Sequence, residues 1–177
     1  MLPYNIFIKD RLLEIRSVVA DDASQWLSYL HQVGDETNFL AFTSAQVTMS
    51  VDEARQYLEH ISKRADNLWL LAADKNRIVA TLNCQRGPWP FARRHVEFGI
   101  SVLAEFWGHG LARNMIATML EWATQNRITK INLKVRTDNT RAIQLYKSMG
   151  FTIEGRPKSE FFRPGVYYPA YHMGLKL

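Results

Sequence analysis

The feature that most constrains this 177-residue chain is a strand pattern that runs through two glycines into a helical pattern. The stretch HVEFGISV (95–102) alternates apolar and polar residues, as a half-buried strand does. Gly108 and Gly110 follow, apolar residues then recur at helical spacing, and a second strand pattern, KINLKVR (130–136), comes next. Strand, helix and strand in this order predict a parallel crossover.

The part of the chain before residue 95 predicts two helices and at least three strands. LLEIRSV (12–18) alternates like a strand, and DDASQWLSYLHQVG (21–34) starts with capping residues before a helical pattern. Ser50 and Glu53 form the capping box of a second helix that ends near Lys63.

A hairpin and a long loop are predicted between residues 67 and 94. Two strand patterns flank Lys75 and Asn76, which is the arrangement of a hairpin. The next connection, GPWPFARR (87–94), carries two prolines around Trp89 and predicts a longer loop.

The C-terminal part predicts a helix over 139–150, a short strand over 151–156 and a last strand over 170–177. We find no internal repeat, low-complexity tract or linker in the sequence. The expectation is one α/β (α+β) domain over residues 1–177.

The glycine turn at residues 105–112 is a candidate phosphate site. Glycine lets the backbone turn sharply and lets a ligand approach closely, and the first N–H groups of a helix lack partners within it. These donors and the helix dipole favour phosphate. The alternative is that Gly108 and Gly110 relieve crowding where strand meets helix. The Gly-Lys-Ser/Thr ending of a P-loop is absent, and Arg113 stands where a dinucleotide fingerprint has a small residue.

Composition limits the class of protein and its partners. Hydrophobic residues make up 47% and charged residues 22%, as in globular domains, and the net charge of +5 suits an anionic partner. The single cysteine, Cys84, cannot form an internal disulfide and is expected to be buried. The N-terminus carries early charges and no apolar run, so we expect a soluble cytoplasmic protein that does not span a membrane.

Two motifs resemble the GCN5-related N-acetyltransferases, the GNAT family. EFWGHGLA (105–112) is similar to the family's Gln/Arg-x-x-Gly-x-Gly/Ala signature, with Glu105 at the first position. NTRAIQLYKSMGF (139–151) is similar to its Asn-x-x-Ala-x-x-x-Tyr-x-x-x-Gly-Phe stretch, and the final segment resembles a family ending with Pro169 in place of Asp. The resemblance covers about residues 10–177. It implies a mixed, mostly antiparallel sheet that is flanked by helices and splayed between its fourth and fifth strands.

The resemblance also implies that acetyl-CoA is the acetyl donor. We expect its pyrophosphate to bind the backbone N–H groups of residues 107–112. We expect its pantetheine to pair with the backbone near Val102 and Leu103 like an added strand. Gly99 predicts a bulge that would free the Ile100 amide to polarise the thioester carbonyl, with a simple packing glycine as the alternative. The donor-binding set is therefore Ile100, Val102, Leu103, Trp107, Gly108, His109, Gly110, Leu111, Ala112, Asn139 and Ala142.

Transfer to an amine requires a base and an acid. Glu97 alternates away from the apolar face of its strand and is the leading general base, with an ion pair to Arg93 or Arg94 as its structural alternative and His95 as the alternative base. By resemblance, the Tyr146 hydroxyl protonates the departing thiolate, although Tyr146 also falls on an apolar stripe typical of a core residue. By resemblance Asn139 contacts pantetheine, and it is also a candidate helix cap.

The function expected from these residues is direct transfer of an acetyl group from acetyl-CoA to a primary amine, with a small molecule as the favoured acceptor. A ribosomal-protein type N-terminal acetyltransferase, a non-catalytic acyl-CoA sensor and a nucleic-acid-binding module are the alternatives. A homodimer is possible, and we expect neither a nucleic-acid partner nor a metal, since the five histidines never fall at ligand spacing. Five aromatic residues near the C-terminus are either an acceptor lining or packing residues: Phe161, Phe162, Tyr167, Tyr168 and Tyr171.

Overall fold

The computed structural model of this protein describes residues 2–64, 66–87, 92 and 94–177. The chain forms two compact units. The first comprises Met1–Gln85 and Gly99–Met119, and the second comprises Arg86–Phe98 and Leu120–Leu177. Strand β5 (His95–Val102) and helix α3 (Leu111–Gln125) contribute residues to both.

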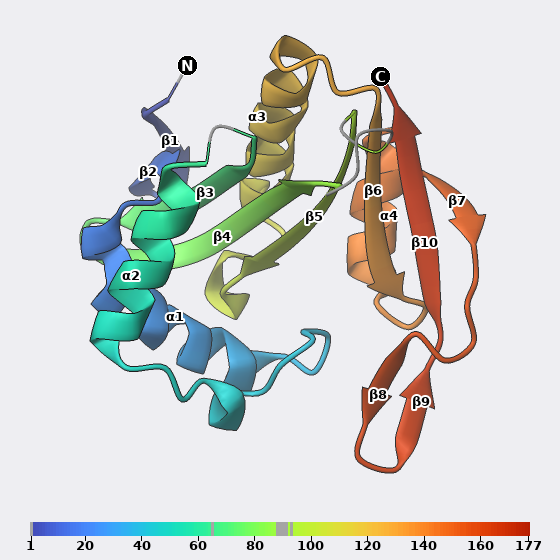
Figure 1. The fold of residues 1–177 in the computed structure, drawn as a ribbon, viewed down its shortest axis with the longest axis horizontal. Helices are drawn as coiled ribbons and strands as arrows, with labels where there is room; N and C mark the ends of the chain where they lie inside the picture. The colour runs from blue at the N-terminus through green and yellow to red at the C-terminus, as the bar shows by residue number, and fades with distance from the viewer. Residues whose placement is uncertain (1, 65, 88–91, 93) are drawn as a thin grey trace. The chain divides into compact units, whose positions relative to one another are not determined.

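The first unit is built on an antiparallel sheet (Figure 1). Its strands lie in the order β1-β2-β3-β4. Their bounds are Tyr4–Ile8, Arg11–Ser17, Leu68–Asp74 and Arg77–Arg86. Helices α1 (Ala23–Glu36) and α2 (Val51–Ser62) lie on the same face of this sheet (Figure 1).

The two N-terminal helices form because their apolar residues fall on one face. Trp26, Leu27 and Val33 of α1 and Leu58 of α2 are buried in the core of this unit. The predicted capping box of α2 is confirmed, since Ser50 Oγ accepts from the Glu53 N–H at 3.3 Å and Glu53 Oε2 accepts from the Ser50 N–H at 2.8 Å.

Asp22 occupies the N-cap position of α1, as predicted, but the side-chain capping bond expected there is not formed. The Asp22 side chain makes no capping bond and instead accepts from Arg16 and from the Val19 N–H. The strand predicted over 12–18, the hairpin at Lys75 and Asn76, and the burial of Cys84 are confirmed. The Pro-rich connection at 87–94 falls largely outside the described residues.

The second unit combines a mixed sheet with helix α4 (Thr140–Ser148). The first half of β5 pairs in parallel with β6 (Lys130–Arg136), joining His95 to Lys130 and Glu97 to Asn132. This confirms the predicted parallel crossover. Strand β10 (Ala170–Lys176) is antiparallel to both β6 and β7 (Thr152–Gly155).

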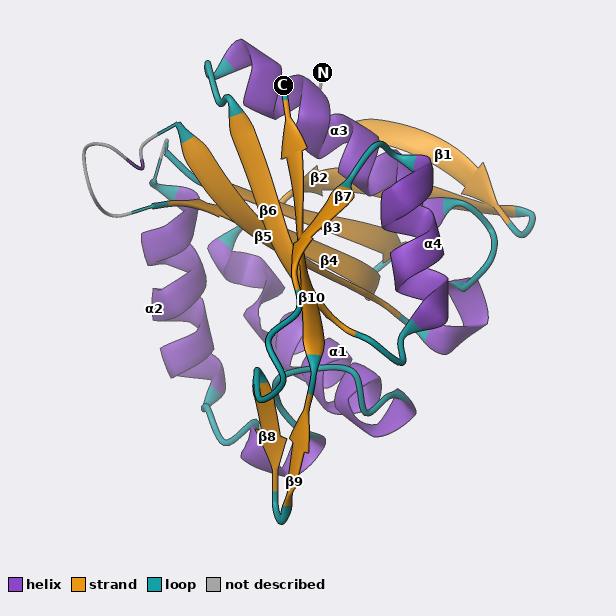
Figure 2. Cartoon of the chain, turned by 90° about the vertical axis from the view of Figure 1, so that its right-hand side faces the viewer, coloured by secondary structure: helices purple, strands orange, loops and turns teal. Residues whose placement is uncertain are grey.

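The sequence pattern did not predict three strands: β1, β8 (Phe161–Arg163) and β9 (Val166–Tyr168). Strand β1 pairs with β2 through a turn at Lys9 and Asp10, which both have positive φ. Strands β8 and β9 form a small hairpin that extends away from the rest of the second unit (Figure 2). Among the described residues, no helix has the length and apolar character needed to cross a membrane.

Candidate acetyl-CoA and catalytic residues

The glycine turn in the first unit joins β5 to α3. A short 3₁₀ turn (Ala104–Phe106) follows the strand, and α3 begins at Leu111, three residues later than the predicted start at Gly108. Gly108 has a φ of +79° and Gly110 a φ of +84°. Both values lie in the left-handed region, which costs any residue with a Cβ about 1–2 kcal/mol.

Crowding does not explain these two glycines. A Cβ on Gly108 would meet no heavy atom within 4 Å, and one on Gly110 would meet only Asn114 Nδ2 at 3.9 Å. The alternative in which the glycines make room for neighbouring side chains is therefore wrong. The backbone conformation requires them, and it leaves open space next to the N-terminus of a 15-residue helix.

The backbone before the turn is already bonded within the first unit. The Leu103 N–H donates to the Val79 carbonyl at 2.9 Å, so this N–H is not available to pantetheine in this conformation. The Val102 carbonyl accepts from the Trp107 indole Nε1 at 2.6 Å, and its second lone pair is the acceptor left for a ligand. The Trp107 N–H donates to the Ala104 carbonyl at 3.1 Å, so this predicted phosphate donor is not available in this conformation.

Gly99 lies where a side chain would contact Asn83. A Cβ at this position would come within 2.9 Å of Asn83 Oδ1. This contact supports the alternative in which Gly99 is a packing glycine. The role of the Ile100 amide at a bulge stays a prediction.

In the second unit, β5 presents its two faces as predicted. Val96 and Phe98 are buried, whereas Glu97 is exposed. Among the described residues no ion pair joins Glu97 to Arg94, and Arg93 lies outside them. The nearby charge of Glu97 helps to raise the pKa of Lys134, although the hydrogen bond of Lys134 to Glu160 is the larger cause. His95 is also exposed.

Tyr146 lies within an aromatic cluster of the second unit. It is 8% exposed, and its ring centroid lies 5.9 Å from that of Phe98 and 6.0 Å from that of Phe151. These ring contacts are those of a core residue, which is the structural role that the apolar stripe predicted for Tyr146. Burial raises the pKa of the Tyr146 hydroxyl to about 12, so the phenol keeps its proton at neutral pH.

Tyr29 has the same shift for the same main reason. Burial raises its pKa to about 12, even though its hydroxyl is within 2.7 Å of Ser101 Oγ. For both tyrosines the folded pKa lies above the unfolded value of about 10. Stability is therefore fully present below pH 10 and is lost as the pH rises from 10 to 12, by about 3 kcal/mol for each tyrosine.

We accordingly expect the free energy of unfolding to fall steeply between pH 9 and pH 11.5. Denaturant titrations at both pH values measure this loss, and Tyr29→Phe should remove about half of it because phenylalanine has no proton to lose. An equal loss in wild type and Tyr29→Phe would contradict the assignment.

Asn139 caps helix α4. Its Oδ1 accepts from the Ala142 N–H at 3.3 Å. The cap uses only the oxygen of the side chain, so the amide NH₂ is a separate donor group that a ligand can use. Both readings of Asn139 are therefore compatible with this geometry.

One polar cluster was missed by the sequence reasoning. Glu160 accepts from Lys134 at 2.8 Å and contacts His172 Nε2 at 2.9 Å. Lys134 holds the pKa of Glu160 below its usual value, ahead of the smaller effect of His172. Lys134 and His172 are register partners on β6 and β10, and sequence periodicity does not reveal register.

Three of the C-terminal aromatic residues differ in their surroundings: two are exposed on a hairpin, and one packs against an arginine. Phe162 and Tyr167 are 61% and 63% exposed and pack against each other at 5.0 Å on the β8–β9 hairpin. Tyr168 packs under Arg136, whose guanidinium carbon lies 3.7 Å from the ring centroid.

A cavity of about 450 Å³ lies in the first unit between α1 and α2. Most of its lining is apolar, and Glu53 is its carboxylate. The lining residues are Leu27, Leu30, Phe42, Gln46, Val47, Thr48, Met49 and Glu53. In the part of the chain that the structure describes, no group of three metal-ligating side chains comes together.

Comparison with known proteins identifies the family. The model of the acetyltransferase (GNAT) family matches residues 32–151. An L-amino acid N-acetyltransferase of Escherichia coli K12 is 38% identical over 119 residues, which are 65% of this chain and 72% of that protein. A spermidine N(1)-acetyltransferase of Vibrio cholerae is 27% identical over 143 residues, which are 80% of this chain and 82% of that protein.

A solved structure agrees in fold. A Salmonella typhimurium protein, solved with its cofactor acetyl-CoA, matches with a TM-score of 0.80 and 17% identity, covering 93% of this chain and 94% of that one. The expected fold, a mixed and mostly antiparallel sheet flanked by helices, is confirmed. Because the family model spans more than half of the sequence and the Escherichia coli relative is 38% identical, the chain belongs to the GNAT family of acetyltransferases.

Proposed function

We propose that this protein transfers the acetyl group of acetyl-CoA directly to the primary amine of a small molecule. The observation that carries the proposal is the open, positive-φ turn at Gly108 and Gly110 at the start of α3, in a chain of the GNAT family. The first N–H groups of a helix lack partners within it, and together with the positive end of the helix dipole they suit a diphosphate.

The diphosphate of the donor would be held by the backbone N–H groups of residues 108–112, since the Trp107 N–H is already bonded to Ala104. The backbone of Val102 and the NH₂ group of Asn139 are the further polar groups that we assign to pantetheine. The family relationship supports this assignment, and the Asn139 cap is compatible with it.

Glu97 would serve as the general base of the reaction and Tyr146 as its general acid. A primary amine with a pKa of about 10 arrives charged at neutral pH, and Glu97 accepts its proton directly or through water. The amine nitrogen then bonds to the acetyl carbon, and the carbon–sulfur bond breaks. Tyr146, which is protonated at neutral pH, donates its proton to the departing thiolate. The nitrogen loses its second proton as the amide forms, and this proton restores the Tyr146 hydroxyl directly or through water.

We assign the body of the acceptor to the cavity between α1 and α2. Its apolar lining suits an amine with an apolar side chain, such as that of an L-amino acid. A polyamine carries several positive charges, and Glu53, the carboxylate in this lining, already accepts from the Ser50 N–H. An apolar amino acid is therefore favoured over spermidine.

A panel of amines tests the reaction and its acceptor. Release of free thiol from acetyl-CoA is measured with L-methionine, L-phenylalanine, spermidine and a peptide with a free N-terminal alanine. We expect turnover with the apolar amino acids. Turnover with the peptide alone would favour the ribosomal-protein type, and binding of acetyl-CoA without turnover would favour a sensor. Salt-sensitive binding to RNA without binding of acetyl-CoA would favour the nucleic-acid module.

A matched pair of glycine substitutions tests the turn. Gly108 and Gly165 have φ values of +79° and +82°, and a Cβ on either would meet no heavy atom within 4 Å. Alanine at either position should therefore lower stability by a similar amount. Only Gly108→Ala should weaken acetyl-CoA binding, by about tenfold, because strain at that position changes the direction of the N–H groups. Calorimetric titration with acetyl-CoA measures this, and equal affinities in the two variants would count against the turn.

Three further expectations belong to the same proposal. We treat residues 1–177 as one catalytic domain, because the family model spans residues of both compact units. The enzyme is expected in the cytoplasm, with no metal required. A homodimer is tested by light scattering on the purified protein.

A further inference from the structure

Glu105 is the residue at which this chain departs from the family's phosphate-binding signature. Where the family has glutamine or arginine, this chain has a carboxylate, three residues before Gly108. A carboxylate at this place would be expected to repel a diphosphate. Its surroundings indicate another role.

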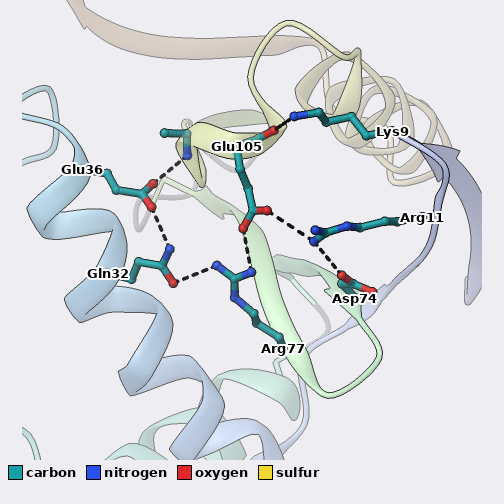
Figure 3. A network of polar contacts seen from close by, with 8 residues as sticks. Lys9, Arg11, Gln32, Glu36, Asp74, Arg77 and Glu105 are labelled. Carbon is teal, nitrogen blue, oxygen red and sulfur yellow. Dashed lines mark hydrogen bonds and ion pairs between the residues drawn. The ribbon is translucent and has the colours of Figure 1, made fainter.

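The Glu105 side chain is shared by two arginines (Figure 3). Its Oε1 lies 2.6 Å from Arg77 Nη1, and its Oε2 lies 3.3 Å from Arg11 Nη1. Arg11 also contacts Asp74 at 3.0 Å, and Arg77 donates to Gln32 Oε1 at 3.1 Å. The negative charge of Glu105, whose side chain is 35% exposed, is thus paired with two guanidinium groups at the surface.

The backbone on both sides of Glu105 is held as well (Figure 3). The Ala104 N–H donates to Glu36 Oε2 at 2.6 Å, and Gln32 Nε2 donates to Glu36 Oε1 at 2.7 Å. Lys9 Nζ donates to the Glu105 carbonyl at 2.7 Å. The partners come from α1, the β1–β2 turn and the β3–β4 hairpin, so three elements that are separate in the sequence meet at this turn.

The charges of this network balance. Its cationic side chains are Lys9, Arg11 and Arg77, and its anionic side chains are Glu36, Asp74 and Glu105. A balanced network adds little net field at an anionic ligand. It does fix a segment that leads into two glycines, which have the most backbone freedom to lose when a ligand orders them.

We propose that Glu105 is a positioning residue, which through Arg77 and Arg11 holds the turn in the conformation that binds the diphosphate of acetyl-CoA. The inference rests on the proposed function. A positioning role and simple repulsion predict opposite changes in acetyl-CoA affinity when Glu105 is replaced. If Glu105 merely repelled the ligand, Glu105→Gln, the family's own residue, would tighten binding, whereas a positioning role means that it weakens binding.

The test measures the Kd for acetyl-CoA by calorimetry, together with kcat and KM, in five variants: Glu105→Gln, Arg77→Gln, their double variant, Arg77→Lys and the control Glu59→Gln. We expect Glu105→Gln and Arg77→Gln each to raise Kd and KM for acetyl-CoA about fivefold. The double variant should show no greater loss than either single variant, because both remove the same contact. The kcat at saturating acetyl-CoA should change by less than about twofold, since Glu105 acts on binding.

Glu59→Gln is the matched control. Glu59 is an exposed carboxylate in α2 that pairs with Lys63 at 2.6 Å and lies outside the network. Its loss should leave acetyl-CoA affinity unchanged. Arg77→Lys keeps the charge but removes the guanidinium fork. If Glu105→Gln folds poorly, the acetyl-CoA affinity of Arg77→Lys tests the same contact.

The outcomes are distinguishable. Wild-type protein that binds acetyl-CoA, together with unchanged or tighter binding by Glu105→Gln, would overturn the positioning role and leave the proposed function standing. A lower thermal midpoint with unchanged Kd would show a structural role only and would also overturn the proposal. Failure of the wild type to bind acetyl-CoA would overturn both.

Discussion

Replacing Tyr146 by phenylalanine is expected to lower kcat by about 100-fold, the lower end of what a positioned acid supplies. The substitution removes one oxygen from a side chain whose ring packs on Phe98 and Phe151. The ring contacts remain, so acetyl-CoA affinity and folding should be nearly unchanged. Steady-state kinetics with saturating acetyl-CoA measure the effect.

Thermal unfolding and acetyl-CoA titration serve as the controls for Tyr146→Phe. Tyr29→Phe is the matched variant, because Tyr29 is also buried, has a similarly raised pKa and is not assigned to the reaction. It should retain wild-type kcat. Wild-type turnover by Tyr146→Phe would show that Tyr146 is a core residue and not the general acid.

Replacing Glu97 by glutamine is expected to lower kcat/KM at pH 7.5 by about 100-fold for an amine with a pKa near 10. Only about 1 in 300 such amine molecules is neutral at that pH, so reaction without a base depends on this fraction. The loss should shrink as the pH rises toward 10, because the amine then deprotonates in solution. A pH profile of kcat/KM for both enzymes measures this convergence.

His95→Gln is the control for the choice of base. Both side chains are exposed and lie two residues apart on β5, so both substitutions change the same surface. We expect His95→Gln to keep wild-type activity. If it instead shows the loss and the pH dependence assigned to Glu97, the base is His95.

The acceptor changes the expected size of the Glu97 effect. A peptide α-amino group has a pKa of about 7.8, so a large fraction is already neutral at pH 7.5. Glu97→Gln should therefore impair acetylation of a peptide N-terminus much less than that of an amine with a pKa near 10. The ratio of the two losses separates a role in proton transfer from a general distortion of β5.

Local pattern was enough to predict most of the elements and the family. The alternation in β5, the capping box at Ser50 and the helical spacing in α4 act over a few residues, so they can be read from the sequence. The positions of Gly108 and Gly110 also predicted the turn, because few residues other than glycine adopt positive φ. The β8–β9 hairpin was missed since each strand has only three residues.

The sequence by itself determined the family, the crossover and the residue types available for the chemistry. Only the tertiary structure decided that Glu105 pairs with Arg11 and Arg77, which are 94 and 28 residues away. It also decided that Glu160 lies between Lys134 and His172. The physical reason is that ion pairs form between side chains brought together by strand register and helix packing, and neither leaves a periodic trace in the sequence.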